Sequence, residues 1–299
     1  MRLLVTGASG QLGAYLLRGL RGTDWQVTAW SGSRTGSLIG VPLQPVDLAD
    51  RAAVTTAFRD AQPQAVLHAA ALSSVAACHG DPERAVQLNV AGTRHLVELT
   101  AAAQVRLLFV STDLVFNGAK GNYTEADAPA PLSIYGKTKR AAEELVLDGA
   151  GNVVARVSLL FGPSLIGKES FFDQQVRALR GGQPVALFDD EWRTPLDYPT
   201  AAQALRQLVA SSVSGLLHVG GSERLSRLEM GHRLARGLQV DPSVIVARSR
   251  LAAPAAEPRP ADTSLDSTRW RTLFPTVSVP SFEEALRQML SGADGPAWA

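Results

Sequence analysis

The sequence contains a single cysteine, Cys78, in 299 residues. One thiol excludes an internal disulfide framework and any multi-cysteine metal site. The five histidines show no metal-ligand spacing, so we predict no metal site. The scarcity of cysteine suits a reducing compartment, and we expect a cytoplasmic protein.

Long apolar runs and an excess of one charge are also missing. Polar and glycine residues interrupt the apolar pattern from Thr6 onward, so we expect no signal peptide and no membrane span, which needs about 18 apolar residues in a row. A net charge of +1 gives no general reason to expect nucleic-acid or membrane partners. The rest is an ordinary globular composition, 45% hydrophobic and 19% charged, with room for one large or two modest domains.

Three glycines separate the first predicted strand from the first predicted helix. Residues 2–6 read as a buried strand, Gly7, Gly10 and Gly13 follow, and residues 12–20 begin a helix. Glycines permit a tight turn and let a pyrophosphate approach the N–H groups at a helix N-terminus. The GxxGxxG spacing differs from the GxGxxG fingerprint of dinucleotide sites. The alternative to a nucleotide site is an ordinary tight turn. The strand–turn–helix context nevertheless predicts a nucleotide site.

The second predicted strand, residues 26–30, lacks the acid that NAD sites usually carry at its end for the ribose 2′-hydroxyl. Ser31, Ser33 and Arg34 stand there instead. These side chains suit a 2′-phosphate, with charge-assisted hydrogen bonds from the guanidinium. We therefore predict NADP rather than NAD. The alternative is that Arg34 is a solvated loop residue.

Two more strands should end at the same edge of the sheet. The strand at 41–46 runs into Asp47, which can reach an adenine or cap a helix over 49–60, and both roles could coexist. The strand at 65–69 runs into small residues that would allow close approach of a cofactor or simply tight packing. A long helix at 82–103 contains Asn89, which is unfavourable in mid-helix unless it has a buried tertiary role.

The chemistry is expected after the next strand, residues 105–110. A hydroxyl from Ser111 or Thr112 follows it, and Tyr135 and Lys139 stand four apart at the start of a helical pattern, so both point from one face. A nearby ammonium should lower the pKa of the phenol toward neutrality, so that the phenol and the hydroxyl together protonate an oxygen as hydride reaches its carbon. The alternative is a Tyr and a Lys on a solvated helix face.

These motifs together resemble an extended short-chain dehydrogenase/reductase, and within it the dTDP-4-dehydrorhamnose reductase (RmlD-like) group. The resemblance covers the first 160 residues throughout and the rest loosely. It rests on Gly7 to Gly13, Ala69-Ala70-Ala71, Asn89, Ser111 to Gly118, Tyr135-Gly136-Lys137-Thr138-Lys139 and Arg156 to Gly162, with weaker matches at Pro199-Thr200, His218 to Gly221, Arg259-Pro260 and Leu265-Asp266.

The resemblance implies a role for each matching position. Tyr135 would be the acid, Lys139 would hold the nicotinamide ribose, and Thr112 would complete a catalytic triad. The implied cofactor contacts are Gly7, Ser9, Gly10, Gln11, Leu12 and Gly13 at the pyrophosphate, Asp47 and Leu48 at the adenine, Ala69, Ala70 and Ala71 along the groove, and Ser111 near the nicotinamide. Ser73, Asp113 and Arg193 would contact the substrate. The chain departs from the group at Ala71-Leu72-Ser73-Ser74 and at Leu114, both near the substrate end.

The resulting expectation for the fold is an α/β protein with a Rossmann-like, doubly wound parallel sheet and a smaller C-terminal α/β lobe. Residues 1–160 should form the NAD(P)-binding domain, with 191–219 returning to it, and 161–190 and 220–299 should form the substrate lobe. Residues 292–299 are expected to be a frayed tail. Arg193, Arg248 and Arg259 are candidates for binding a sugar-nucleotide diphosphate, although each alone would more often be a surface residue.

The expected function is NADP-dependent reduction of a nucleotide-linked keto-deoxysugar, of the kind used in dTDP-rhamnose biosynthesis, by a monomer or homodimer. One alternative is a sugar-nucleotide epimerase or dehydratase on the same fold. Leu114 argues against dehydration, because dehydratases of this kind usually carry an acid there. A second alternative is a non-catalytic, NADP-binding regulatory subunit, since fold alone does not choose a function.

Overall fold

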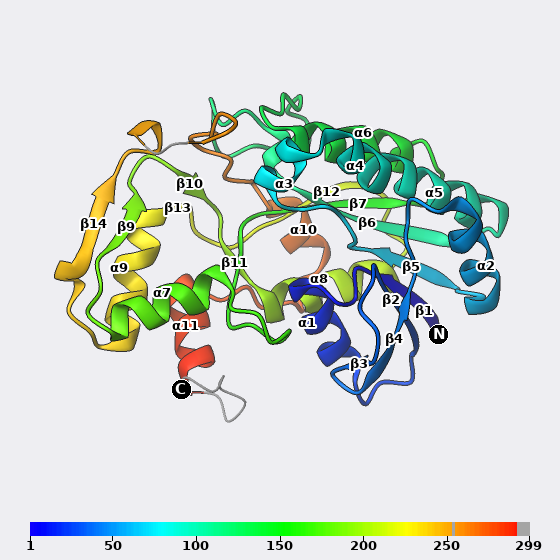
Figure 1. The fold of residues 1–299 in the computed structure, drawn as a ribbon, viewed down its shortest axis with the longest axis horizontal. Coiled ribbons are helices and arrows are strands. Elements are labelled where there is room, and N and C mark those ends of the chain that lie inside the picture. Colours follow the sequence, from blue (N-terminus) through cyan, green and yellow to red (C-terminus); the bar gives the residue numbers. More distant parts are fainter. Residues whose placement is uncertain (253–254, 292–299) are drawn as a thin grey trace.

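The computed structural model describes residues 1–252 and 255–291 and centres on an eight-stranded sheet (Figure 1). Its strand order is β12-β7-β6-β5-β1-β2-β4-β3, and every neighbouring pair is parallel except the antiparallel β3–β4 pair at one edge. The strands are β1 (Arg2–Thr6), β2 (Gln26–Ser31), β3 (Ser37–Leu38), β4 (Val41–Pro45), β5 (Ala65–His68), β6 (Arg106–Thr112), β7 (Val153–Val157) and β12 (Gly215–Val219).

Helices cover both faces of this sheet, as Figure 1 shows. On one face lie α1 (Gln11–Leu20) and α8 (Tyr198–Ala210), and on the other lie α2 (Arg51–Ala61), α4 (Pro82–Val86), α5 (Gly92–Ala102) and α6 (Ile134–Leu147). Side chains of a strand alternate between the two faces. Leu3 and Val5 therefore join the core under α1 and α8, whereas Leu4 joins the core under α2 and α5. The predicted Rossmann-like, doubly wound fold is confirmed.

The long helix predicted over 82–103 is interrupted. One π-helical turn, Gln87–Ala91, joins α4 to α5, and the short α3 (Val75–Gly80) precedes them. The predicted buried role of Asn89, which lies in this turn and is 1% exposed, is confirmed. The predicted helix cap at Asp47 is wrong, because Asp50 caps α2 by accepting from the N–H groups of Ala52 and Ala53.

A second hydrophobic core lies beside the sheet, at the left of Figure 1. Phe172, Leu187, Leu234 and Leu286 are among the buried residues that form it. Its elements are α7 (Phe171–Arg180), β9 (Val185–Phe188), α9 (Arg227–Leu238), β14 (Ile245–Arg248) and α11 (Phe282–Ser291), and β9 pairs with β14 in parallel. The predicted frayed tail, residues 292–299, lies outside the described residues.

Short two-stranded ladders and one helix connect the two parts. β8 (Leu160–Phe161) pairs in parallel with β11 (Leu196–Asp197), β10 (Trp192–Arg193) pairs antiparallel with β13 (Leu225–Ser226), and α10 (Thr268–Leu273) packs near β12. Three 3₁₀ turns complete the structure, at Asp113–Val115, Pro242–Val244 and Arg250–Ala252. Within the described residues, we find no helix with the length and apolar character needed to cross a bilayer.

Candidate active site

The glycine-rich turn after β1 is shaped for close backbone approach. Gly7 has a φ of +69°, and a Cβ at this position would lie 2.6 Å from the backbone nitrogen of Ala70. A Cβ at Gly13 would collide with the Gly7 carbonyl oxygen. Gly10 takes the N-cap position of α1 without a side-chain hydrogen bond, so the first N–H groups of the helix are available to an anion.

A groove of about 330 Å³ runs along the carboxyl ends of β1, β2 and β5. It is lined by Thr6, Gly7, Ser9, Trp30, Ser31, Gly32, Ser33, Val46, Asp47, Leu48, Ala69, Ala70, Ala71, Arg84 and Leu88. Nine of these positions, among them Ser9, Asp47 and Ala70, were singled out from the sequence. Ligands of doubly wound sheets bind in this place. The turn and the groove therefore fit an extended dinucleotide.

Arg84 is the charged groove residue that sequence reasoning missed. Its guanidinium makes an ion pair with Asp47 at 2.9 Å across 37 residues of chain. The pKa of Asp47 is lowered, first by the N–H of Ala49 and then by Arg84, so Asp47 remains an anion at the adenine end. In the sequence, only Asp81-Pro82, a pair typical of a helix start, indicated that the Arg84 side chain would lie near the strand ends.

Several predicted cofactor residues have side chains engaged elsewhere. Arg34 donates to the carbonyl of Ile166 at 3.3 Å, and Ser31 donates to the carbonyl of Arg34. The amide of Gln11 donates to the Pro163 carbonyl at 2.6 Å. The predicted positions that do not line the groove are Gly10, Gln11, Leu12, Gly13, Arg34, Ser111, Tyr135 and Lys139.

The structure brings Thr112 and Tyr135 together. Tyr135 lies in the first turn of α6, which Ser133 caps by accepting from the N–H of Gly136 at 3.1 Å. Thr112, at the end of β6, hydrogen-bonds the Tyr135 phenol and donates to Asp113 at 3.2 Å. Burial and then the Asp113 carboxylate raise the pKa of Tyr135, which keeps the phenol protonated at neutral pH.

Lys139 lies on the same helix, and its amine packs against β6. Its Nζ donates to the Val110 carbonyl at 2.6 Å and stands 3.8 Å from the ring centroid of Phe109. Burial lowers the pKa of Lys139 to about 7, and Glu143 opposes that shift. The expectation that Lys139 lowers the pKa of Tyr135 is wrong for this arrangement, because the pKa of Tyr135 is raised and Lys139 is not among its perturbing neighbours.

A buried ion pair connects α6 to β7. Glu143 on α6 accepts from Arg156 on β7 at 2.8 and 2.7 Å, and the two side chains are 0% and 1% exposed. Ser111 donates to the same carboxylate at 2.6 Å, so its hydroxyl points away from the cofactor groove. The signal in the sequence was a single arginine within an otherwise apolar strand.

Asn89 connects the groove to α6. Its amide oxygen accepts from the Leu72 N–H at 2.8 Å, and its amide nitrogen donates to the Leu72 carbonyl at 3.1 Å and to Thr138 at 3.0 Å. The segment from Ala69 to Leu72 is therefore held against α6. Ser73, the next residue, is exposed.

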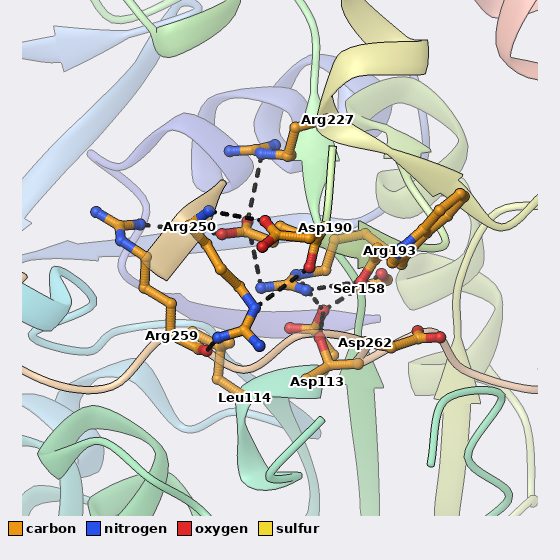
Figure 2. Close-up of polar contacts among 12 residues, drawn as sticks. Asp113, Leu114, Ser158, Asp190, Arg193, Arg227, Arg250, Arg259 and Asp262 are labelled. Carbon is orange, nitrogen blue, oxygen red and sulfur yellow. Dashed lines mark hydrogen bonds and ion pairs between the residues drawn. The ribbon is translucent and has the colours of Figure 1, made fainter. Parts of the chain in front are cut away.

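A second cavity of about 390 Å³ lies between the main sheet and the second core. Asp113, Leu114, Glu191, Arg193, Arg227 and Arg259 line it, together with Val75, Ala76, Ser133, Leu159, Ala255, Ala256, Glu257, Pro258 and Pro260. Figure 2 shows the charged side chains gathered at this cavity. Of the three arginines predicted for a diphosphate, Arg193 and Arg259 line the cavity, whereas Arg248 donates to the Ala252 carbonyl and does not.

The charges in this cavity are paired (Figure 2). Glu191 faces three guanidinium groups, those of Arg193 at 3.3 Å, Arg227 at 3.4 Å and Arg259 at 4.0 Å. Asp113 faces Arg193 at 3.6 Å and accepts from Thr263 at 2.9 Å. Burial raises the pKa of Asp113, and Arg193 opposes this shift.

The comparison with protein families decides the classification. A model of the RmlD substrate binding domain matches residues 1–294. The chain belongs to this family. The family resemblance stated from the sequence motifs is thereby confirmed.

Curated relatives of this RmlD-family chain include both a subunit of methionine adenosyltransferase and a probable reductase. The chain is 29% identical over 291 residues to methionine adenosyltransferase 2 subunit beta of Rattus norvegicus, covering 91% of this chain and 82% of the relative. It is 30% identical over 269 residues to the probable low-salt glycan biosynthesis reductase Agl14 of Haloferax volcanii, covering 87% and 88%.

Solved structures match along the whole chain. A hypothetical dTDP-4-dehydrorhamnose reductase from Sulfolobus tokodaii is 30% identical, with a TM-score of 0.81 and coverage of 91% and 94%. A dTDP-4-dehydrorhamnose reductase from Bacillus anthracis, in complex with NADP, shares the fold at 23% identity, TM-score 0.86 and coverage of 97% and 98%. A Thermus thermophilus UDP-glucose 4-epimerase complexed with NAD is 26% identical, with TM-score 0.80 and coverage of 96% and 97%.

Proposed function

We propose that the protein is an NADP-dependent reductase of a keto group on a nucleotide-linked deoxysugar. The observation that carries this proposal is that Tyr135 and Thr112 adjoin the second cavity, which Asp113 and Ser133, close to them in the sequence, help to line. Ala69 to Ala71 line the groove, and Val75 and Ala76, a few residues on, line the second cavity. One ligand in each cavity would meet at the phenol.

The phenol of Tyr135 carries its proton at neutral pH, because its pKa is raised rather than lowered. Reduction of a carbonyl consumes a proton, and a phenol that keeps its proton at neutral pH is in the form that can donate it. Thr112, hydrogen-bonded to the phenol, would orient the same carbonyl oxygen. NADPH, when bound, supplies the hydride. The amine of Lys139, which donates to the Val110 carbonyl, would also contact the ribose of the cofactor.

The shape of the glycine turn supports the binding of a dinucleotide in the groove, and the side chains at the strand ends favour NADP over NAD. Ser31 and Ser33 line the groove where NAD sites usually carry an acid. Arg34 directly follows Ser33 in the sequence. Arg84 lines the groove itself. We expect Arg34→Ala to raise the KM for NADPH and leave the KM for NADH unchanged, and equal changes in both would contradict the role of Arg34 at the 2′-phosphate.

The second core and its connections are proposed as the substrate lobe. Arg193, Arg227 and Arg259 would meet the diphosphate, because guanidinium groups bind phosphate oxygens through parallel hydrogen bonds. Binding would require Glu191 to share these three arginines with the substrate. The sugar would then extend toward Asp113 and Tyr135.

The test is NADPH oxidation by the purified protein with dTDP-4-keto-6-deoxy sugars, dTDP-4-dehydrorhamnose among them, with NADH run in parallel. Oxidation that requires the sugar and prefers NADPH would support the proposal. The relatives named as subunit beta of methionine adenosyltransferase 2 keep a second function in view, that of a regulatory subunit. NADPH binding without oxidation, and stable co-purification with a larger enzyme, would favour that function.

A further inference from the structure

Glu257 is the charged residue of the second cavity whose carboxylate is only half used. Its side chain is 8% exposed and lines the cavity. One oxygen, Oε1, accepts from the N–H of Ile134 at 2.8 Å and lies 3.9 Å from Nδ1 of His79. The other oxygen, Oε2, is buried and has no hydrogen-bond partner among the described residues. Burying such an atom without a partner is costly, so its presence calls for a reason.

The other carboxylates of this cavity are already engaged. Asp113 accepts from Thr112 and Thr263 and faces Arg193, and Glu191 faces three guanidinium groups. Within the part of the chain that the structure describes, Oε2 of Glu257 is therefore the buried carboxylate oxygen of the lining residues that has no hydrogen-bond partner.

Two hydrogen bonds position the segment that carries Glu257. All of this segment, residues 255–260, lines the cavity. The segment is fixed at its far end, where the Arg259 carbonyl accepts from Arg250 at 3.0 Å (Figure 2). Glu257 itself fixes the near end to the first turn of α6, where the positive end of the helix stabilises its negative charge. The free oxygen thus has a defined place, next to the helix turn that carries Tyr135.

We propose that Glu257 is a specificity residue that accepts a hydrogen bond from a hydroxyl group of the sugar ring. A carboxylate oxygen repels phosphate and accepts only from donors, so this wall selects the hydroxyl-bearing end of a ligand. Arg193, Arg227 and Arg259, which line the same cavity, favour the phosphate groups of the ligand instead. The inference rests on the proposed function, because it assumes a nucleotide sugar in this cavity.

The test compares the affinities for dTDP and dTDP-glucose by titration calorimetry, with NADPH present. dTDP-glucose has no keto group and is not reduced, so it is a stable probe for the contribution of the sugar. In Glu257→Ala, the ratio of the two affinities should fall about tenfold or more, as expected for a lost hydrogen bond to a charged group, and the affinity for dTDP should stay the same. Glu257→Gln keeps an acceptor for Ile134 and should lose about threefold.

Asp50→Ala is the matched control, since it removes a carboxylate that accepts from helix N–H groups far from the cavity. It should lower the melting temperature without changing the ratio. If both ligands bind and the ratio in Glu257→Ala equals that of the wild type, the inference is wrong while the proposed function stands. If neither ligand binds the wild type, both fall. Should Glu257→Ala fail to fold, an unchanged ratio in Glu257→Gln overturns the inference, and a reduced ratio supports it.

Discussion

Removing Glu143 should destabilise the protein severely. The carboxylate is fully buried, bonds Arg156 at 2.8 and 2.7 Å, and accepts from Ser111 at 2.6 Å. Glu143→Ala leaves a buried guanidinium without its counter-charge, which costs about 3–5 kcal/mol, and strands one hydroxyl donor, which costs about 1 kcal/mol more. Domains are typically stable by about 5–15 kcal/mol, so this single change removes a large share of the free energy of unfolding.

Urea unfolding, followed by tryptophan fluorescence and far-UV circular dichroism, measures this loss. The double variant Glu143→Leu with Arg156→Met should be more stable than Glu143→Ala, because well-packed apolar residues can replace a buried pair without leaving a charge behind. Glu98→Ala is the control, since Glu98 pairs with Arg51 on the surface and should contribute less than about 1 kcal/mol. A free energy of unfolding for Glu143→Ala within about 1 kcal/mol of the wild type would refute the reasoning.

Two further predictions concern the same site. Lys139 has a pKa lowered to about 7 when folded, so between about pH 7 and its ordinary value near 10.5 the unfolded chain binds more protons, and stability should rise with pH in this window; thermal melts of wild type and Lys139→Met across pH 6–10 check this, and equal pH slopes would contradict it. Gly7→Ala places a Cβ against Ala70 at a φ of +69°, so it should cost about 1–3 kcal/mol of stability and weaken NADPH binding more than tenfold, which fluorescence titration measures; unchanged binding would count against the close approach.

The sequence predicted the elements that depend on local pattern. The strand–glycine–helix start and the parallel sheet follow from short-range signals, namely apolar runs and glycine spacing. The positions at the strand ends, such as Ser33, Asp47 and Ala70, were found because parallel strands bring their carboxyl ends to one edge.

Side-chain directions and long-range pairings were not predictable in the same way. Lys139 shares a helix face with Tyr135, but packing turns its amine to the Val110 carbonyl, and burial and Asp113 raise the pKa of the phenol. Arg84 and Glu257 reach their sites across distant parts of the chain, through contacts with Asp47 and Ile134. No spacing within the sequence encodes such contacts.

The most direct test of the central claim is the turnover of Tyr135→Phe with NADPH and the dTDP-4-keto-6-deoxy sugar that the wild type reduces, measured beside its affinity for NADPH. The proposed role predicts wild-type cofactor affinity and a loss of turnover of about 100-fold or more, the usual contribution of a general acid. Turnover equal to that of the wild type would show that Tyr135 does not supply the proton.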